Sequence, residues 1–316
     1  NNNYPQFAQL DKHRVCGVKL FMGSSTGNML VDRMASLRNI FGGTDLLIAA
    51  HCEDQGIIKE NTDKYKKAYG DDVPLTLHPV IRSEEACYRS SELAVQLARE
   101  ANARLHIMHI STARELDLFS DAPLITKRIT AEACVSHLLF TEDDYQTLGA
   151  RIKCNPAIKT AEDRKALQEA VNSGLIDAIA TDHAPHLLSE KEGGALKAMS
   201  GMPMIQFSLA SMLELVDKDI FSIEKIVEKM SHAPAQMYEI NNRGFIHKGY
   251  QADLVLVRPN SKWTVTTDCI VSKCQWSPLE GHTFNWKVEK TFVNGHLLYD
   301  NGKIDETYRG QELRFR

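Results

Sequence analysis

Short apolar runs alternate with amphipathic stretches from about residue 15 to residue 231 of the chain. The apolar runs read VCGVKLFM, LLIAAHC, LHIMHI, ITAEACVSHLLF and DAIATD, and they begin at residues 15, 46, 105, 129 and 177. Helical spacing of apolar residues follows at 83–101, 160–172, 203–217 and 222–231, and residues 55–77 read as a polar helical excursion. Repeated alternation of strand and helix is typical of a parallel sheet, either open or closed into a barrel.

Three of the predicted helices have a suitable first residue. Ser83, Thr160 and Ser222 each precede a helical pattern, and hydroxyl side chains at this position accept hydrogen bonds from the free amides of the first turn. Glu84 and Glu85 add negative charge where the helix dipole favours it. These signals support the helix boundaries that the apolar spacing suggests.

The pattern changes at residue 244. From there on, apolar and polar residues alternate with period two, and the pairs Asn294-Gly295 and Asn301-Gly302 are typical of hairpin turns. We therefore expect two parts, an α/β region over residues 1–244 and a small β-rich domain with a tail over residues 245–316.

Composition excludes several classes of function. The 316 residues are 43% hydrophobic and 25% charged, with a formal net charge of −4, which gives no basic surface for nucleic acid. No apolar run has the length of a membrane span, and the polar start NNNYPQFAQLDKH has no signal-peptide pattern. The seven cysteines are scattered without paired spacing, which favours a reducing cytoplasm.

One lysine stands out within the first apolar run. Lys19 lies between Val18 and Leu20, just before the turn-forming GSSTG, and a lone ammonium in an apolar interior is very costly. Either Lys19 forms an ion pair at the end of a strand, which is the ordinary interpretation, or its amine is chemically modified.

Four predicted strands end in or near a residue that can bind a metal. These residues are Lys19, His51, His109 and Asp182. Each alone is weak evidence, because a histidine at a strand end is more often a hydrogen-bonded core residue. In a (β/α) barrel, however, the strand ends converge on the face where active sites are built. Two imidazoles, a carboxylate and a modified lysine would suit zinc.

Several segments of the chain form recognisable motifs: GVKLFMGSSTGNML, AAHCED, LHIMHIST, ATDHAPH, SHAPAQMYEI with RGFIHKGYQADLVLV, and SPLEGHTF. These segments resemble the cyclic-amidohydrolase branch of the amidohydrolase superfamily, and within it the dihydroorotases. They occur in family order over nearly the whole chain. The resemblance implies a metal-dependent hydrolase with a (β/α)8 TIM barrel and a small C-terminal β-domain. It implies reversible cyclisation of N-carbamoyl-L-aspartate to L-dihydroorotate in pyrimidine biosynthesis, in the cytoplasm, and a homodimer is what the family leads us to expect.

The resemblance also implies roles for the four strand-end residues. Lys19 matches the lysine that reacts with CO₂ to form a carbamate bridging two zinc ions. His51 and His109 match ligands of the second zinc. Asp182 matches the aspartate that binds the first zinc and transfers a proton.

Further matches imply the substrate contacts. Asn155 matches the asparagine that contacts the pyrimidine ring, although before Pro156 it could equally be a turn residue. His186 matches the histidine that holds the substrate carboxylate. The backbone of Gly201 and Met202, after Ser200, resembles the loop that completes the pocket.

The sequence departs from the family in two places. It contains no His-x-His, the motif that ends the family's first barrel strand, so we expect the barrel to be incomplete at its N-terminal side and the first zinc to lack two ligands. Lys153 and Lys159 flank Asn155, where relatives often carry an arginine. Glu132 and His137, on the strand predicted over 129–140, are candidates to support the metal ligands.

Three functions therefore stay open. Dihydroorotase is favoured by SPLEG, Asn155 and His186, because its substrate carries a carboxylate that needs partners. The alternatives are a hydantoinase, dihydropyrimidinase or allantoinase type of cyclic amide hydrolase, and a non-catalytic barrel that has lost ligands.

Overall fold

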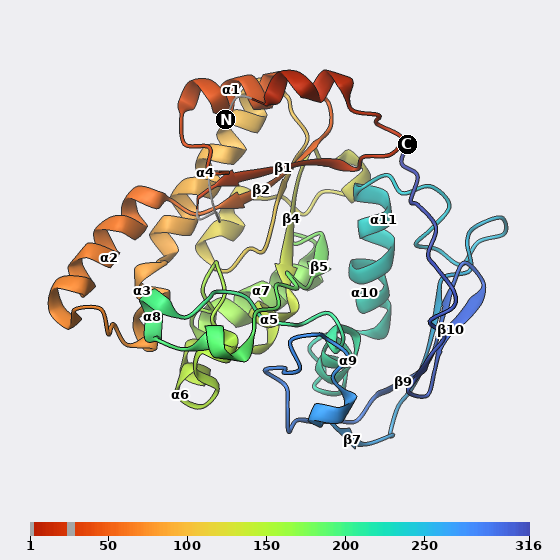
Figure 1. Cartoon of the computed structure of the whole chain (residues 1–316). Helices are drawn as coiled ribbons and strands as arrows, with labels where there is room; N and C mark the ends of the chain where they lie inside the picture. The colour runs from red at the N-terminus through yellow and green to blue at the C-terminus, as the bar shows by residue number, and fades with distance from the viewer. Residues whose placement is uncertain (1–2, 24–28) are drawn as a thin grey trace.

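A five-stranded parallel sheet forms the centre of the computed structural model, which describes residues 3–23 and 29–316 (Figure 1). Its strands are β1 (Gly17–Met22), β2 (Leu47–Cys52), β3 (Leu105–Ile107), β4 (Ile129–Cys134) and β5 (Ala178–Ala180). They are adjacent in the order β1-β2-β3-β4-β5, and every pair is parallel. The predicted alternation of strands and helices is thus confirmed, and with it the α/β class. The predicted turn segment at residues 24–28 lies outside the described residues.

Helices lie between most of the successive strands, 3-10 turns alone connect β3 to β4, and further helices follow β5. The longer ones are α1 (Met34–Gly42), α2 (Gln55–Tyr69), α4 (Glu84–Ala101), α7 (Ala161–Ser173) and α9 (Ser208–Asp217). The shorter ones are α3 (His78–Ile81), α5 (Val135–Leu139), α6 (Tyr145–Leu148), α8 (Gly194–Lys197), α10 (Ile223–Val227) and α11 (Ala233–Met237). None of the helices that the structure describes is both long and apolar enough to cross a membrane.

The predicted helix starts agree with the structure at all three capping residues. The Ser83 hydroxyl accepts a hydrogen bond from the Ala86 amide, and Ser222 does the same for Lys225. Thr160 and Asp163 form a reciprocal capping box at the start of α7.

The two faces of β1 have different neighbours, which decides where Lys19 points. Val18, Leu20 and Met22 are buried in the main core, which also contains Leu37 and Phe41 of α1. Side chains alternate along a strand, so Lys19 and Phe21 belong to the opposite face of the sheet.

Three sequence-predicted boundaries are wrong. The strand predicted over 129–140 ends at Cys134, and α5 follows at once. The helix predicted at 203–217 begins only at Ser208. The helix predicted at 222–231 is short, and a π-helical segment, Glu228–His232, connects it to α11. In each case the apolar spacing was right, but it does not mark where hydrogen bonding changes register.

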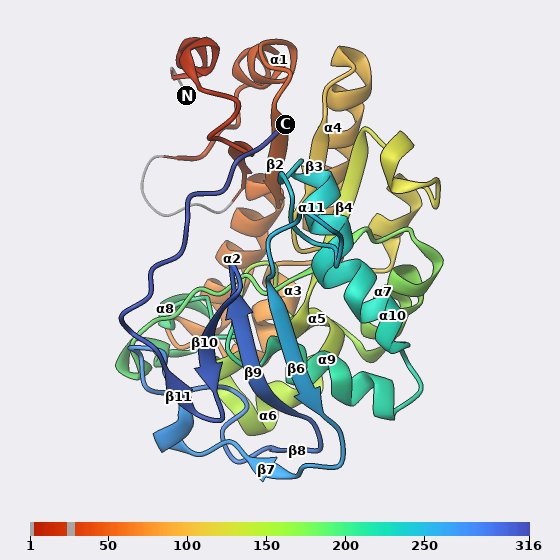
Figure 2. The same ribbon diagram turned by 90° about the vertical axis from the view of Figure 1, so that its right-hand side faces the viewer.

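A separate antiparallel sheet follows in the C-terminal part (Figure 2). It contains β11 (Lys303–Ile304), β10 (His296–Asp300), β9 (Lys287–Val293) and β6 (Leu254–Arg258), in that order. A two-stranded ladder pairs β7 (Trp263–Thr264) with β8 (Thr283–Phe284). The expected hairpin β-structure is therefore present, and the fold combines barrel-type α/β structure with a small β-sheet.

Candidate active site

Three of the four predicted metal-binding residues lie at the carboxyl ends of the parallel strands. His51 is the penultimate residue of β2, whereas Lys19 lies in the middle of β1, opposite Ala49, and not at the strand end that the sequence predicted. His109 and Asp182 follow β3 and β5 by two residues, and both have a φ of +43°. Such backbone conformations are uncommon for residues other than glycine and concentrate at functional sites. Because the strands are parallel, His51, His109 and Asp182 share the carboxyl edge of the sheet, and Lys19 lies two residues before the β1 residue that pairs with His51.

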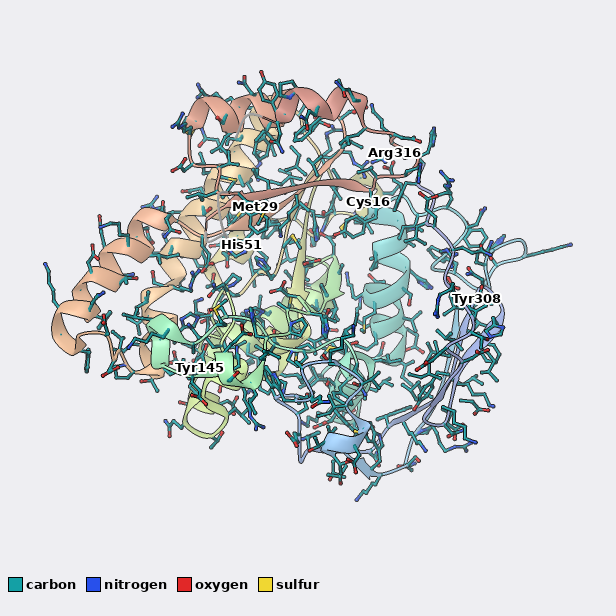
Figure 3. The ribbon with its side chains drawn as sticks, in the orientation of Figure 1. Cys16, Met29, His51, Tyr145, Tyr308 and Arg316 are labelled. Carbon is teal, nitrogen blue, oxygen red and sulfur yellow. The ribbon has the colours of Figure 1, made fainter. Side chains whose placement is uncertain are left out.

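His51 and His109 form the tightest contact of this group. The Nδ1 of His51 lies 2.9 Å from the Nε2 of His109, and the rings meet edge to face with centroids 4.7 Å apart. Both side chains are buried. Figure 3 labels His51 at the end of β2, in the interior of the molecule. The structure thus brings together two residues that are 58 positions apart in the chain.

Glu53 binds the ring nitrogen of His51 that does not face His109. No role for Glu53 was predicted from the sequence. The Nε2 of His51 donates to Glu53 Oε2 over 2.8 Å, and the Arg82 guanidinium donates to the same oxygen. Burial opposes ionisation of Glu53, but Arg82 and His51 outweigh it and hold its pKa well below the usual range. A carboxylate that fixes one imidazole nitrogen leaves the other with its lone pair, as in many metal sites. The spacing of Glu53 two residues after His51 was the signal available in the sequence.

His109 is kept neutral by its surroundings. Burial, with smaller contributions from His51, Lys19 and His137, holds the pKa of His109 well below its ordinary value. Its Nδ1 is buried and has no hydrogen-bond partner among the described residues. Neutral imidazole is the form that binds metal ions.

Lys19 lines the open side of the sheet rather than the core, which corrects the expectation of a buried lysine. Its side chain is exposed, its Nζ lies 2.6 Å from the Met108 sulfur, and no ion pair with a described residue is present. Burial of the amine nevertheless lowers the pKa of Lys19, while the negative charges of Asp182 and Glu132 oppose this shift. The residue therefore reaches solvent while its amine is partly buried, and the charges of Asp182 and Glu132 act on that amine from a distance rather than through an ion pair.

Asp182 faces the same open side. Solvent reaches its side chain, yet partial burial of the carboxyl group raises its pKa, as does the negative charge of Glu132, whereas Lys19 and His51 lower it. The charges of Asp182 and Lys19 therefore act on each other, without an ion pair between these two described residues.

These residues have the donor atoms that a metal ion needs, but only some of those atoms lie close together. No group of three His, Cys, Asp or Glu side chains within residues 3–23 and 29–316 is close enough to hold a metal. The converging nitrogens of His51 and His109, with Glu53 bound to His51, supply two imidazole donors, and Lys19 and Asp182 lie close enough to shift each other's pKa. Imidazole and carboxylate donors suit zinc.

The two proposed supporting residues have different positions. Glu132, in β4, accepts a hydrogen bond from His106 Nε2 over 3.0 Å and contributes to the charge around Lys19. His137 lies in α5 rather than on a strand, and its Nε2 donates to the Pro156 carbonyl over 3.1 Å. Burial lowers the pKa of His137 to about 4.

Hydrogen bonds bring together the segments predicted to bind substrate. The Gly201 amide donates to the Lys153 carbonyl over 2.8 Å, and the Ala184 amide donates to the Met202 carbonyl over 3.2 Å. His186 Nε2 donates to the Ser200 carbonyl over 3.1 Å. The segments around Asn155, His186, Gly201 and Met202 are therefore neighbours.

Gly201 is required by this close packing. Its φ is +139°, and a Cβ at this position would lie 2.5 Å from the Ala184 carbonyl oxygen and 3.0 Å from His186 Cδ2. Any larger residue would push apart the two loops that Gly201 joins.

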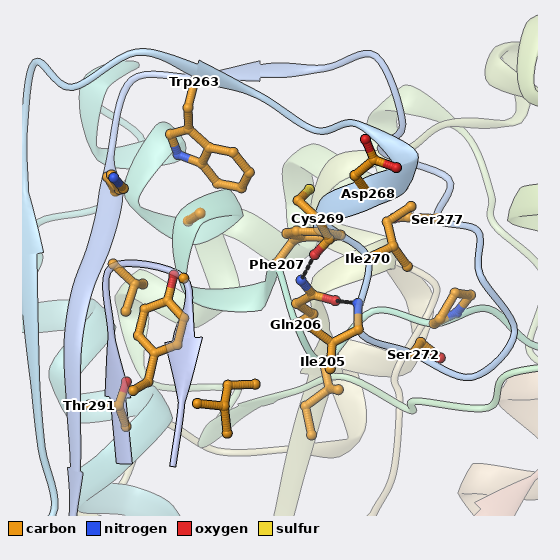
Figure 4. A pocket seen from close by; sticks show the side chains of 18 of the residues that line it. Ile205, Gln206, Phe207, Trp263, Asp268, Cys269, Ile270, Ser272, Ser277 and Thr291 are labelled. Carbon is orange, nitrogen blue, oxygen red and sulfur yellow. Dashed lines mark hydrogen bonds between the residues drawn. The ribbon is translucent and has the colours of Figure 1, made fainter. Parts of the chain in front are cut away.

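A cavity of about 770 Å³ lies elsewhere, between the start of α9 and the C-terminal sheet (Figure 4). Phe207, Trp263 and Tyr299 line it, and Gln206 bridges its wall by hydrogen bonds to the Cys269 carbonyl and the Val271 amide. Its lining includes none of the predicted site residues, so it is not where the strand-end chemistry is located.

The family model and the similar proteins found by comparison agree with one another. Residues 32–298 match the model of the amidohydrolase family. The chain is 38% identical over 205 residues to a dihydroorotase of Clostridioides difficile, covering 65% of this chain and 48% of that protein. It is 30% identical over 300 residues to a dihydroorotase of Halobacterium salinarum, covering 94% of this chain and 67% of the relative.

A solved structure extends the likeness to the whole fold. The L-hydantoinase of Arthrobacter aurescens superposes with a TM-score of 0.91 at 25% identity, over 100% of this chain and 71% of that chain.

The chain spans about half to two thirds of the length of the curated dihydroorotases it matches. The match to the family model extends over most of the sequence, and the chain belongs to the amidohydrolase family.

Proposed function

We propose that this protein hydrolyses and forms cyclic amides, with dihydroorotate and N-carbamoyl-L-aspartate as its substrate pair. The observation that carries the proposal is the buried pair of His51 and His109, whose nitrogens lie 2.9 Å apart with the charges of Lys19 and Asp182 nearby. The similarity to dihydroorotases supports this choice of substrate.

The proposed metal is zinc, held by His51, His109, Asp182 and a carbamate on Lys19. The neutral Lys19 amine would attack CO₂, forming an N–C bond and releasing a proton, and its lowered pKa favours that neutral form. When bound, two metal ions would lower the pKa of water and polarise the substrate carbonyl. Glu53 keeps the His51 ring in the required tautomer.

Asp182 is the proposed proton carrier. As a water oxygen bonds to the ring carbonyl carbon, the Asp182 carboxylate takes the water proton. It then returns this proton to the ring nitrogen as the C–N bond breaks. The raised pKa of Asp182 brings the group closer to the pH at which such transfers are efficient.

The neighbouring loops are the proposed substrate-binding region. Asn155 would contact the ring, His186 the carboxylate, and the backbone of Gly201 and Met202 would complete the pocket. The hydrogen bonds among their segments support this grouping. We propose that these residues all belong to a barrel part at residues 1–244, followed by the β-rich part at 245–316.

A second candidate is a hydantoinase or allantoinase activity. The TM-score of 0.91 to an L-hydantoinase and the 30% identity over 257 residues to an allantoinase of Bacillus velezensis favour it. These enzymes are expected to share the strand-end residues, so the loops would decide between the substrates.

Turnover and zinc content of the complete protein test the proposal. We expect stoichiometric zinc and faster turnover of dihydroorotate than of hydantoin or allantoin. Asp182→Asn should abolish turnover, whereas Asp63→Asn, at an exposed position in α2, should not change it. Preference for hydantoin would favour the second candidate. Absence of both zinc and turnover would instead indicate a non-catalytic barrel.

A further inference from the structure

Buried side chains hold the backbone of the segment around Asn155. His78 Nε2 donates to the Cys154 carbonyl over 2.9 Å, and His137 Nε2 donates to the Pro156 carbonyl over 3.1 Å. Both histidines are buried, and each comes from a different helix. The carbonyl groups on both sides of Asn155 are therefore fixed from outside the segment.

Lys191 connects this segment to the loop that contains Gly201. Its Nζ donates to the Lys153 carbonyl over 3.1 Å, to the Met199 carbonyl over 2.6 Å and to the Gly201 carbonyl over 2.6 Å. Only 5% of the residue surface is exposed. An ammonium has three protons, and here each has a backbone acceptor.

The acceptors of Lys191 are all neutral. Among the residues that the structure describes, none of the carboxylates forms an ion pair with it, and Trp276 presents its ring 5.8 Å from Nζ. A buried cation without an opposing charge is costly and persists only where the surrounding structure fixes it. Lys191 therefore has a more specific task than filling space in the core.

We propose that Lys191 is a positioning residue that locks the Asn155 segment and the Gly201 loop in the arrangement that binds substrate. This inference rests on the proposed function, because both segments carry the proposed substrate contacts. The Lys191 ammonium donates its hydrogen bonds to backbone carbonyls only and faces the Trp276 ring. Misplacement of a group by about 1 Å can cost up to ~10²-fold in rate. Because these two segments carry the proposed substrate contacts and not the reacting groups, we expect their displacement to reduce substrate affinity.

The protonation state of Lys191 provides an independent test of this role. The pKa of Lys191 is lowered to about 8, mainly by burial; Cys154 opposes this shift, and the positive charge of Lys153 contributes to it. Burial also lowers the pKa of Lys153 to about 8. Above that pH, Lys191 becomes a neutral amine with two protons for three carbonyls, and its hydrogen bonds to the two segments weaken.

The test compares Lys191→Met, Lys191→Arg and the control Lys165→Met, which changes an exposed lysine of α7. Hydrogen–deuterium exchange without substrate should show faster exchange at residues 153–157 and 199–202 in Lys191→Met alone. The KM for dihydroorotate should rise about 10-fold or more in that variant, with a smaller change in kcat. Lys191→Arg should restore most of the affinity.

The pH profile separates positioning from a general loss of stability. In the wild type we expect KM to rise above about pH 8, and in Lys191→Arg that rise should shrink because guanidinium stays charged. Unchanged exchange at both segments in Lys191→Met, or identical pH profiles of wild type and Lys191→Arg, would overturn the inference. If Lys191→Met does not fold, the comparison with Lys191→Arg still decides. Absent turnover in the wild type would refute the proposed function, while the exchange experiment would still test whether Lys191 holds the two segments in place.

Discussion

The two halves of the candidate site are held in different ways. In the strand-end half, side chains contact side chains, as in the chain of His109, His51, Glu53 and Arg82. In the loop half, buried donors such as Lys191 contact backbone carbonyls. The first arrangement fixes the position and tautomer of individual reactive groups, whereas the second fixes the shape of a binding surface.

This difference predicts which property each half controls. Loss of a strand-end residue should remove metal and chemistry together, because each group is itself a donor or holds one. Loss of a loop contact should mainly change substrate affinity, because the reactive groups stay in place. The following experiments test this division.

Lys19→Ala should have the largest effect. Without the proposed carbamate, zinc content and turnover should fall together, and turnover should drop by at least about 10³-fold. A short carboxylic acid that fills the space should restore part of both. Metal analysis and steady-state kinetics measure the outcome, with Lys165→Ala as the exposed control. Unchanged zinc content would show that Lys19 has no part in metal binding.

Glu53→Gln should weaken zinc binding by about 10- to 100-fold, because the ring of His51 loses its ionic anchor. Competition with a chelator gives the zinc affinity directly. Glu85→Gln, which alters an exposed ion pair with Arg89, is the matched control and should leave affinity unchanged. Equal zinc affinities in the two variants would contradict a supporting role for Glu53.

His137→Gln should change the acid sensitivity of folding. The folded-state pKa of about 4 lies below the ordinary value of 6.5, so unfolded chains bind protons first as the pH falls. Stability that is present above pH 6.5 is therefore lost progressively toward pH 4, and His137 alone should account for about 2 kcal/mol between pH 7 and pH 5. The glutamine can still donate to Pro156 but does not titrate. Urea unfolding at both pH values should show a smaller loss in the variant, and an identical loss would exclude His137 as the cause.

Gly201→Ala should have the smallest effect, about a 10-fold increase in KM. The added Cβ would lie 2.5 Å from the Ala184 carbonyl oxygen, so the loop must shift. Zinc content should stay at the wild-type level, which distinguishes this loop variant from the strand-end variants. Gly149→Ala, where a Cβ meets nothing within 4 Å but the positive φ is retained, is the control.

Local patterns predicted the strand-end half better than the loop half. Parallel strands share one edge, so a His or Asp at the end of each apolar run was expected to meet its counterparts, and His51 and His109 do. The caps of α4 and α7 also followed from single residues. Sequence did not show that Lys19 is exposed, because that depends on what covers the other face of β1.

The loop half depends on contacts between distant segments. Lys191 and Lys153 are 38 positions apart, and no periodicity connects them. His137 was placed on a strand because its apolar neighbours continue past Cys134, where the backbone in fact enters α5. Side chains that bind backbone carbonyls leave no spacing pattern, so only the folded structure identifies them.

X-ray absorption at the zinc edge of the complete, zinc-loaded protein tests the central claim most directly. We predict nitrogen and oxygen neighbours at about 2.0–2.1 Å with imidazole scattering, which should decrease in the His51→Ala and His109→Ala variants. Sulfur neighbours at about 2.3 Å, or an imidazole signal that both substitutions leave unchanged, would contradict a zinc site built on His51 and His109.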